Sequence, residues 1–151
     1  MKKGFTLVEI LIAVSILGIL AAIVLPQFRS HAYAARESAG KDNLRILRTA
    51  IERYAAMHSD VPPGYQDNDT SNNPTYTSFY DQLVTVEKYL TKIPENPFSG
   101  LVDTKILLDS EAFPATAENT DQYGWMYKPS AKKIKLNSPG TDSEGVSFFD
   151  Y

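Results

Sequence analysis

The sequence predicts an α+β protein: a long N-terminal helix, membrane-spanning in its first half and amphipathic in its second, packed against a small antiparallel β-sheet domain. The helix is predicted because residues 5–25 are almost entirely apolar and the following residues place apolar side chains at helical spacing. The sheet is predicted because residues 123–136 contain two alternating stretches around a proline-containing turn.

Composition limits the classes of function. The chain has 151 residues, which suits one ordinary domain with an attached segment. Its net charge of −3 offers no basic field for a polyanion, so nucleic acid is not an expected partner. With no cysteine in the sequence, a disulfide framework, a thiolate metal site and a cysteine nucleophile are all excluded.

The first element is the apolar run Phe5–Leu25, 21 residues long. As a helix it would measure about 31 Å, close to the hydrocarbon thickness of a bilayer. Lys2 and Lys3 precede it, and such short basic flanks stay in the cytoplasm. The remainder of the chain is therefore expected on the outer side of the membrane.

Glu9 interrupts this run and has to be explained. An ordinary signal peptide with the cleavage triplet Ala32-Tyr33-Ala34 is disfavoured, because the apolar run is too long and contains an acid. A plain membrane anchor is the second interpretation, with the Glu9 carboxylate reaching back to the cytoplasmic interface. It leaves unexplained why a glycine, an aromatic residue and a hydroxyl residue directly precede the acid.

The third interpretation comes from a resemblance. The sequence Gly4-Phe5-Thr-Leu-Val-Glu9, followed by an apolar helix ending Leu25-Pro-Gln-Phe28, resembles the N-terminus of type IV pilins and of type II secretion pseudopilins. The resemblance implies that prepilin peptidase cuts between Gly4 and Phe5 and methylates the new amino group of Phe5. It also implies four parts: a leader (1–4), a transmembrane or filament-core helix (5–25), an amphipathic continuation (26–60) and a small extracytoplasmic globular part (61–151).

Cleavage would give Glu9 a partner. The new ammonium at Phe5 and the Glu9 carboxylate are each costly alone in lipid, and pairing relieves both penalties. Because the two residues are one helical turn apart, the pair could form within one chain. The family resemblance implies that Glu9 also meets the amine of a neighbouring subunit, and the sequence leaves both options open.

Two further positions are expected to serve assembly. Gly18 and Ala22 form a small-xxx-small pair that lets helices approach closely in a membrane. Pro26 lacks the donor for a bond to the Ala22 carbonyl, so the sequence predicts a kink or local unwinding just before it.

Beyond Pro26 the sequence predicts an amphipathic helix to about Asp60, before Val61-Pro-Pro-Gly64. Its buried stripe is expected to contain Leu44, Leu47, Ile51, Tyr54 and, at the end, a packed His58. The i,i+4 pairs Glu37–Lys41 and Arg48–Glu52 are expected on the opposite, solvated face.

The globular part is expected to begin with a short helix, capped by Ser78 and ending before Ile93-Pro94. Residues 123–128 and 133–136 then form a hairpin around Pro129-Ser-Ala131, with an aromatic face packed on the long helix and Val146–Phe149 as a third strand.

The segment from Ser138 to Gly145 contains glycine and acidic residues. It resembles the C-terminal loop with which major pseudopilins bind calcium, and the resemblance implies Asp142, Glu144 and Asp150 as ligands, since calcium prefers hard oxygen donors. The family loop usually has more acidic residues where this chain has Val146-Ser-Phe-Phe149. A β-turn loop without metal is the alternative.

No catalytic constellation accompanies these features, so an enzyme is not expected. The predicted function is a structural subunit of a type IV pilus-like filament in the bacterial inner membrane, with the globular part periplasmic. Its expected partners are other copies of the chain, prepilin peptidase, an inner-membrane assembly platform with its ATPase, and minor pilins or pseudopilins. A type II secretion pseudopilin is favoured. The alternatives are a true pilin for adhesion, motility or DNA uptake, and a secreted or membrane-anchored binding domain.

Overall fold

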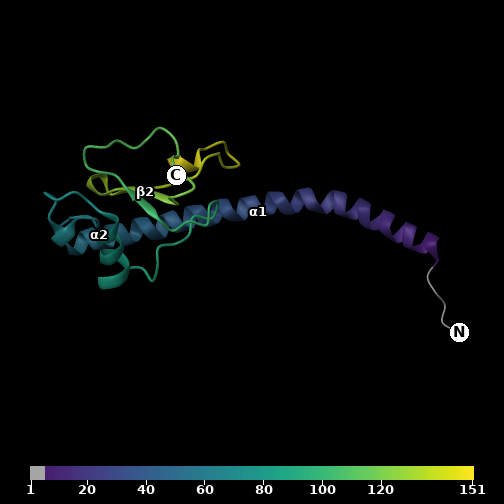
Figure 1. Ribbon diagram of the computed structural model, residues 1–151, viewed down its shortest axis with the longest axis horizontal. Helices are drawn as coiled ribbons and strands as arrows, with labels where there is room; N and C mark the ends of the chain where they lie inside the picture. The colour runs from purple at the N-terminus through teal and green to yellow at the C-terminus, as the bar shows by residue number, and fades with distance from the viewer. Residues whose placement is uncertain (1–5) are drawn as a thin grey trace. The chain divides into compact units, whose positions relative to one another are not determined.

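A computed structural model describes residues 6–151, except for the side chains of residues 25, 26 and 29 (Figure 1). The chain forms two compact units, one ending at Ala35 and the other beginning at Arg36. In chain order the elements are α1 (Leu7–Met57), η1 (Gln66–Asn68), α2 (Tyr76–Tyr80), η2 (Asp81–Val86), β1 (Thr104–Ile106), β2 (Trp125–Lys128), η3 (Pro129–Ala131), β3 (Lys133–Leu136) and η4 (Phe148–Asp150). This confirms the predicted α+β class.

The first unit contains the N-terminal part of α1, which is apolar and exposed. Of the residues described, one stretch is long and apolar enough to cross a membrane: Leu7–Val24, with a mean hydropathy of 2.8. None of these residues is buried within the chain. Because exposing this much apolar surface to water is unfavourable, the stretch needs lipid or neighbouring helices around it.

The backbone of α1 stays helical at Pro26. The sequence predicted a kink or local unwinding before this residue, but no unwound residue interrupts the helix between Leu7 and Met57. A proline removes one intrahelical hydrogen bond, and the bonds on either side can keep the chain helical. Of the two alternatives, local unwinding does not occur in the single chain, whereas a kink before Pro26 stays a prediction.

In the second unit, α1 buries the stripe that the sequence predicted. Leu44, Leu47, Ile51 and Tyr54 are all almost inaccessible to solvent. The helix ends at Met57 and not near Asp60, because Ser59 and Asp60 adopt left-handed φ values of 55° and 69°. His58 is packed as expected: its ring stacks on that of Tyr54 with 4.0 Å between centroids.

The short helix α2 begins earlier than the sequence predicted. Thr75, not Ser78, is its N-cap, and the Thr75 side chain accepts a hydrogen bond from the Ser78 amide. The π-helix η2 continues α2 and buries Leu83, whereas Val86 at its end is 68% exposed. Both threonine and serine suit an N-cap, so composition alone could not choose between them.

The sheet has the order β1-β2-β3. Strands β2 and β3 are antiparallel, with Trp125 opposite Leu136, and η3 joins them as the predicted hairpin turn. The third strand, however, is β1, which pairs with β2 in parallel. The sheet is therefore mixed, and the prediction of a purely antiparallel sheet is wrong.

Residues 146–149, expected as the third strand, instead contribute one bridge between Ser147 and Thr141 and then enter η4. Ser147 caps this turn by accepting a hydrogen bond from the Phe149 amide. Phe148 and Phe149 are both buried. Successive strand residues point to opposite faces, whereas a short turn can bury two neighbours beside the same core.

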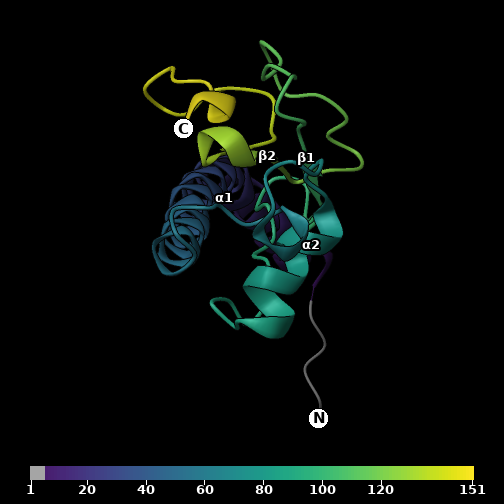
Figure 2. The same cartoon turned by 90° about the vertical axis from the view of Figure 1, so that its left-hand side faces the viewer.

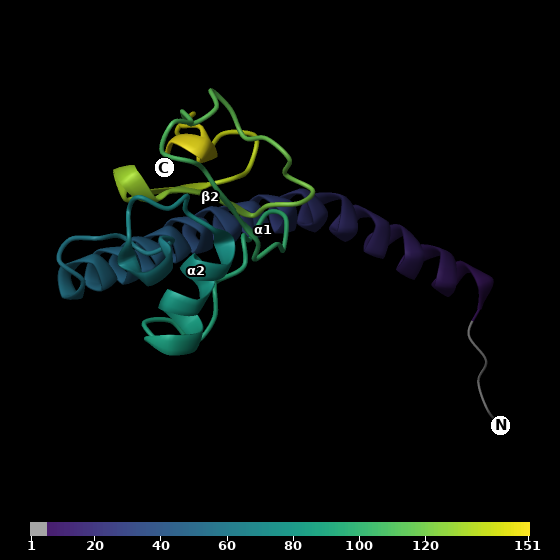
Figure 3. The same ribbon diagram turned by 60° about the vertical axis from the view of Figure 1, so that its left-hand side comes forward.

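The hydrophobic core of the second unit lies between α1, the sheet, α2 and the C-terminal residues. In Figures 2 and 3, η4 and α2 lie at different sides of the C-terminal half of α1. The aromatic face of β2 packs in this core as predicted, since Trp125 and Tyr127 cluster with the buried residues of α1. The Tyr127 ring also contacts Phe79 of α2, at 4.9 Å between centroids.

Candidate functional site

The start of α1 holds the Glu9 carboxylate by local hydrogen bonds. Glu9 Oε2 accepts from the Thr6 backbone amide at 2.8 Å and from the Thr6 hydroxyl at 2.9 Å. The Glu9 amide donates in return to Thr6 Oγ1 at 3.2 Å. This is a capping box, in which a threonine and a glutamate three residues later satisfy each other's free amides.

The capping role of Thr6 was missed in the sequence, although its signal was present as the spacing Thr6-x-x-Glu9. The predicted cleavage and methylation positions, Gly4 and Phe5, lie outside the described residues. The pairing of Glu9 with an amine at Phe5 therefore remains a prediction. The structure shows that the Glu9 carboxylate also caps its own helix.

Gly18 faces open space in the single chain. A Cβ atom built at this position would meet no neighbouring atom within 4 Å. Nothing in the described residues thus requires a glycine here, which suits the predicted use of Gly18 in close contact with another helix. The contact itself remains a prediction.

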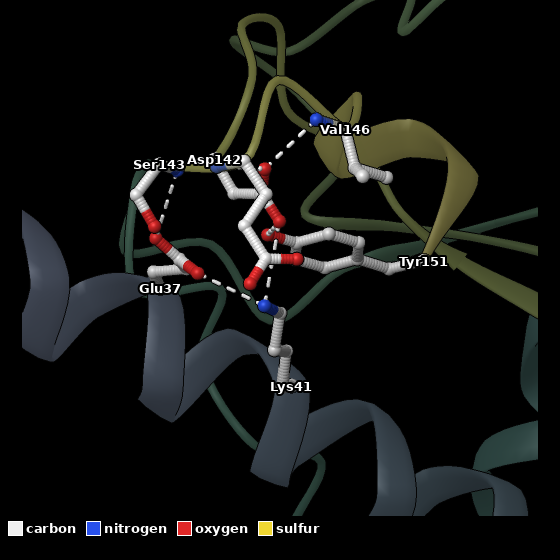
Figure 4. A network of polar contacts seen from close by, with 7 residues as sticks. Glu37, Lys41, Asp142, Ser143, Val146 and Tyr151 are labelled. Atoms are coloured by element: carbon white, nitrogen blue, oxygen red, sulfur yellow. Dashed lines mark hydrogen bonds and ion pairs between the residues drawn. The ribbon is translucent and has the colours of Figure 1, made fainter.

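A second candidate site joins α1 to the C-terminal loop, defined here as residues 138–151 (Figure 4). Asp142 lies at its centre, with its side chain 2% exposed. Its Oδ1 accepts from the amides of Glu144 at 2.9 Å and Val146 at 2.8 Å. Its Oδ2 accepts from the Tyr151 hydroxyl at 2.8 Å and from Lys41 Nζ at 3.4 Å.

Helix α1 contributes two charged residues to this site. Lys41 Nζ lies 2.9 Å from Glu37 Oε1 and 4.7 Å from the centre of the Tyr151 ring. The second oxygen of Glu37 accepts from the Ser143 amide at 3.4 Å. The prediction of a solvated face is wrong for Glu37, whose side chain is only 12% exposed, while the Lys41 side chain stays 48% exposed although its ammonium contacts the C-terminal loop.

Arg48, also assigned to the solvated face, likewise reaches the C-terminal residues. Its guanidinium donates to the backbone oxygens of Tyr151 and Ile134. Burial lowers the pKa of Arg48, because a partly desolvated guanidinium favours its charged form less. Together with Lys41, this arginine fixes the end of the described chain on α1.

The pKa values of the site follow from these contacts. Burial alone would raise the pKa of Asp142, but the hydrogen bonds from Tyr151, Val146, Glu144 and Lys41 outweigh it and lower the pKa below the ordinary 3.8. The Glu37 carboxylate raises the pKa of Lys41 above its ordinary value. Burial, followed by the Asp142 contact, raises the pKa of Tyr151 to about 12.

The three residues predicted as calcium ligands do not converge. Asp142 is surrounded by hydrogen-bond donors, while Glu144 is exposed and contributes its amide to Asp142. The Asp150 side chain, 62% exposed, lies 3.3 Å from Lys135 Nζ. Across residues 6–151, no three histidine, cysteine or acidic side chains gather to hold a metal ion.

This geometry predicts how the loop responds to pH. A carboxyl group whose pKa is lowered by folding stabilises the fold above its ordinary value, and that contribution is lost as the pH falls through the folded value. The contacts of Asp142 should therefore persist from neutral pH down to the ordinary pKa of 3.8 and be lost only below it, as the pH falls through the lowered pKa. In an NMR titration, the Glu144 and Val146 amide signals should move together in this acidic range. Asp142→Asn should abolish the transition, and a midpoint above the ordinary value would contradict the prediction.

Comparisons with known proteins agree with the apolar helix and its N-terminal motif. The family described as the prokaryotic N-terminal methylation motif matches residues 1–25. The type II secretion system core protein G of Pseudomonas aeruginosa is 30% identical over 99 residues, which cover 66% of this chain and 70% of that protein. No solved structure gives a significant match.

Two pilins match this chain over a shorter stretch than protein G does, at a higher identity. The type IV major pilin protein PilA of Myxococcus xanthus is 48% identical over 53 residues, or 35% of this chain and 24% of that protein. The type IV major fimbrial protein FimA of Dichelobacter nodosus is 44% identical over 52 residues, or 34% of this chain and 33% of that protein. The chain belongs to the family of type IV pilins and type II secretion pseudopilins.

Proposed function

We propose that the chain is a major-type pseudopilin of a type II secretion system, a structural subunit that polymerises through α1. The match to the secretion core protein G carries this proposal, because it extends over 99 residues. The first compact unit ends at Ala35, so most of that match falls in the second unit. The lack of cysteine in the sequence adds support, since many type IV pilins close their C-terminal loop with a disulfide.

In the proposed pathway, the chain first inserts into the bacterial inner membrane with Lys2 and Lys3 in the cytoplasm. The second unit then lies in the periplasm, following the positive-inside rule. Prepilin peptidase cuts between Gly4 and Phe5, where a glycine permits close approach to the backbone, and methylates the new amine. A platform with its ATPase then draws the subunit into a filament with other copies and with minor pseudopilins.

The assembly step relies on α1. In the filament the apolar stretch Leu7–Val24 exchanges lipid for the helices of neighbouring subunits, and small residues such as Gly18 let those helices approach. Glu9 pairs with the amine at Phe5 of its own or of a neighbouring chain, which sets the axial position of the incoming subunit. The role proposed is thus mechanical and not catalytic.

Mass spectrometry of the protein purified from its native membrane tests the processing step. The mature chain is expected to start at Phe5 and to carry one methyl group on its amino terminus. A chain that still begins at Met1, or one that begins at Ala35 after signal-peptide cleavage, would contradict the proposal. The phenotype of a strain lacking the gene supplies a second readout.

A true type IV pilin is the second candidate, favoured by the higher identity to PilA and FimA. The two roles predict different phenotypes for a gene deletion. Loss of a pseudopilin should stop the export of secreted proteins and leave surface pili intact. Loss of surface pili with normal secretion would instead support the pilin, with adhesion, motility or DNA uptake as its task.

A further inference from the structure

A cation supplied by the chain itself lies between α1 and the C-terminal loop. Lys41 Nζ lies near Glu37 Oε1 at 2.9 Å and Asp142 Oδ2 at 3.4 Å, with the Tyr151 ring 4.7 Å away. The two carboxylates come from different segments, since Asp142 is 101 residues from Lys41 in sequence. Figure 4 shows the lysine pointing from the helix toward the loop.

The Asp142 carboxylate requires such a cation. Its side chain is only 2% exposed, and an unpaired buried carboxylate is strongly unfavourable. Two backbone amides and one hydroxyl already donate to it, from Glu144, Val146 and Tyr151. Lys41 is the positively charged group in contact with it among the described residues.

A calcium ion does not fit the same place. Calcium takes six to eight oxygen ligands, whereas the oxygens of Asp142 all accept hydrogen bonds from N–H or O–H groups. The ammonium of Lys41 lies between the carboxylates of Glu37 and Asp142, so a divalent ion could not take the same position. The ammonium and a calcium ion are both positive, and their repulsion prevents them from occupying this place together.

We propose that Lys41 is the structural cation of the C-terminal loop, so that the loop folds without a divalent metal ion. Glu37 orients the ammonium from one helical turn away and also accepts from the Ser143 amide. One turn of α1 thereby contacts the loop through two side chains, the positive Lys41 and the negative Glu37. The exposed residues Ser143–Val146 are connected to the helix through the Ser143 amide and through the amides that Asp142 accepts from. This inference does not depend on which filament the chain forms.

Hydrogen exchange of the full chain in detergent micelles tests the proposal. The variants are Lys41→Met, the double variant Lys41→Met with Asp142→Asn, and Arg45→Met as the matched control. Arg45 lies one turn further along α1, and its partner is Asp42 on the same helix, with both side chains exposed. The control variant therefore removes a similar cation whose ion pair does not involve the loop. Each protein is measured with a chelator and again with added calcium chloride.

For the unaltered chain, exchange at the Glu144 and Val146 amides should be the same with chelator and with calcium. Lys41→Met should speed exchange at these two amides by roughly tenfold or more, because a buried carboxylate has lost its counter-charge. The double variant should regain part of the protection, since the buried charge of Asp142 is gone and only the Glu37 carboxylate, which is partly exposed, is left without its cation. Arg45→Met should behave like the unaltered chain.

Amides in the hairpin, such as Asn137, which donates to the Gly124 carbonyl, serve as the internal reference for folding. If Lys41→Met leaves the protection of Glu144 and Val146 unchanged, Lys41 is not the structural cation. If the chelator speeds exchange in the unaltered chain, or calcium slows it, a metal ion holds the loop and the proposal is wrong. Neither result would bear on filament assembly, which is tested separately.

Discussion

Replacing Trp125 with alanine is expected to lower the free energy of unfolding of the second unit by about 3–5 kcal/mol, the usual cost of emptying a large aromatic site in a core. Trp125 is fully buried at the start of β2, and its indole nitrogen donates to the Pro94 carbonyl at 2.9 Å. Because a domain is stable by only about 5–15 kcal/mol, this single change should leave the second unit close to unfolding. Urea denaturation, followed by near-ultraviolet circular dichroism of the nine tyrosines, measures the loss.

Two other variants distinguish the loss of buried volume from the loss of the hydrogen bond to Pro94. Trp125→Phe keeps most of the ring volume but leaves the Pro94 carbonyl without its donor, so it should cost about 1–3 kcal/mol. Val86→Ala removes an apolar side chain that is 68% exposed and should change stability by less than about 0.5 kcal/mol. A Trp125→Ala protein as stable as Val86→Ala would contradict the role of Trp125 as the centre of the core.

The regular parts of this fold could be predicted because their signals are local. The apolar stripe of α1, from Leu44 to Tyr54, repeats at helical spacing over several turns, and the hairpin has alternating residues around Pro129. Strand β1 carries no such signal. Its three residues, Thr104–Ile106, form a strand only because β2 offers its edge about twenty residues later in the chain, and parallel pairing is decided by tertiary structure.

The sequence predicted only part of the site in the C-terminal loop. The acidic residue Asp142 was singled out, but its partner Lys41 was assigned to solvent with Glu37, because an i,i+4 ion pair is typical of an exposed helical face. Which face of a helix is covered depends on a segment far along the chain, and here that segment is the loop itself. By contrast, the cap formed by Thr6 and Glu9 is entirely local and could have been found.

Replacing Glu9 with alanine is expected to abolish filament formation while leaving the second unit folded. Position 9 lies in the stretch Leu7–Val24, far in sequence from the buried core residues of Arg36–Tyr151. If the carboxylate neutralises an amine at Phe5, its loss leaves that ammonium unpaired in an apolar environment, which is strongly unfavourable. Sedimentation of filaments from cells should therefore show a yield reduced by at least about tenfold.

The structure complicates this test, because Glu9 also caps its own helix through Thr6. Glu9→Gln separates the two roles, since glutamine can accept the same hydrogen bonds in a capping box but carries no charge. Mass spectrometry should first establish that both variants are cut after Gly4, so that assembly and not processing is compared.

If charge pairing drives assembly, Glu9→Gln should fail as completely as Glu9→Ala. A filament yield near that of the unaltered chain for Glu9→Gln, with failure of Glu9→Ala alone, would show that the helix cap suffices. The neutral variant is the decisive one because a capping box gains little from a net charge, whereas an ammonium in an apolar surrounding is neutralised only by a carboxylate.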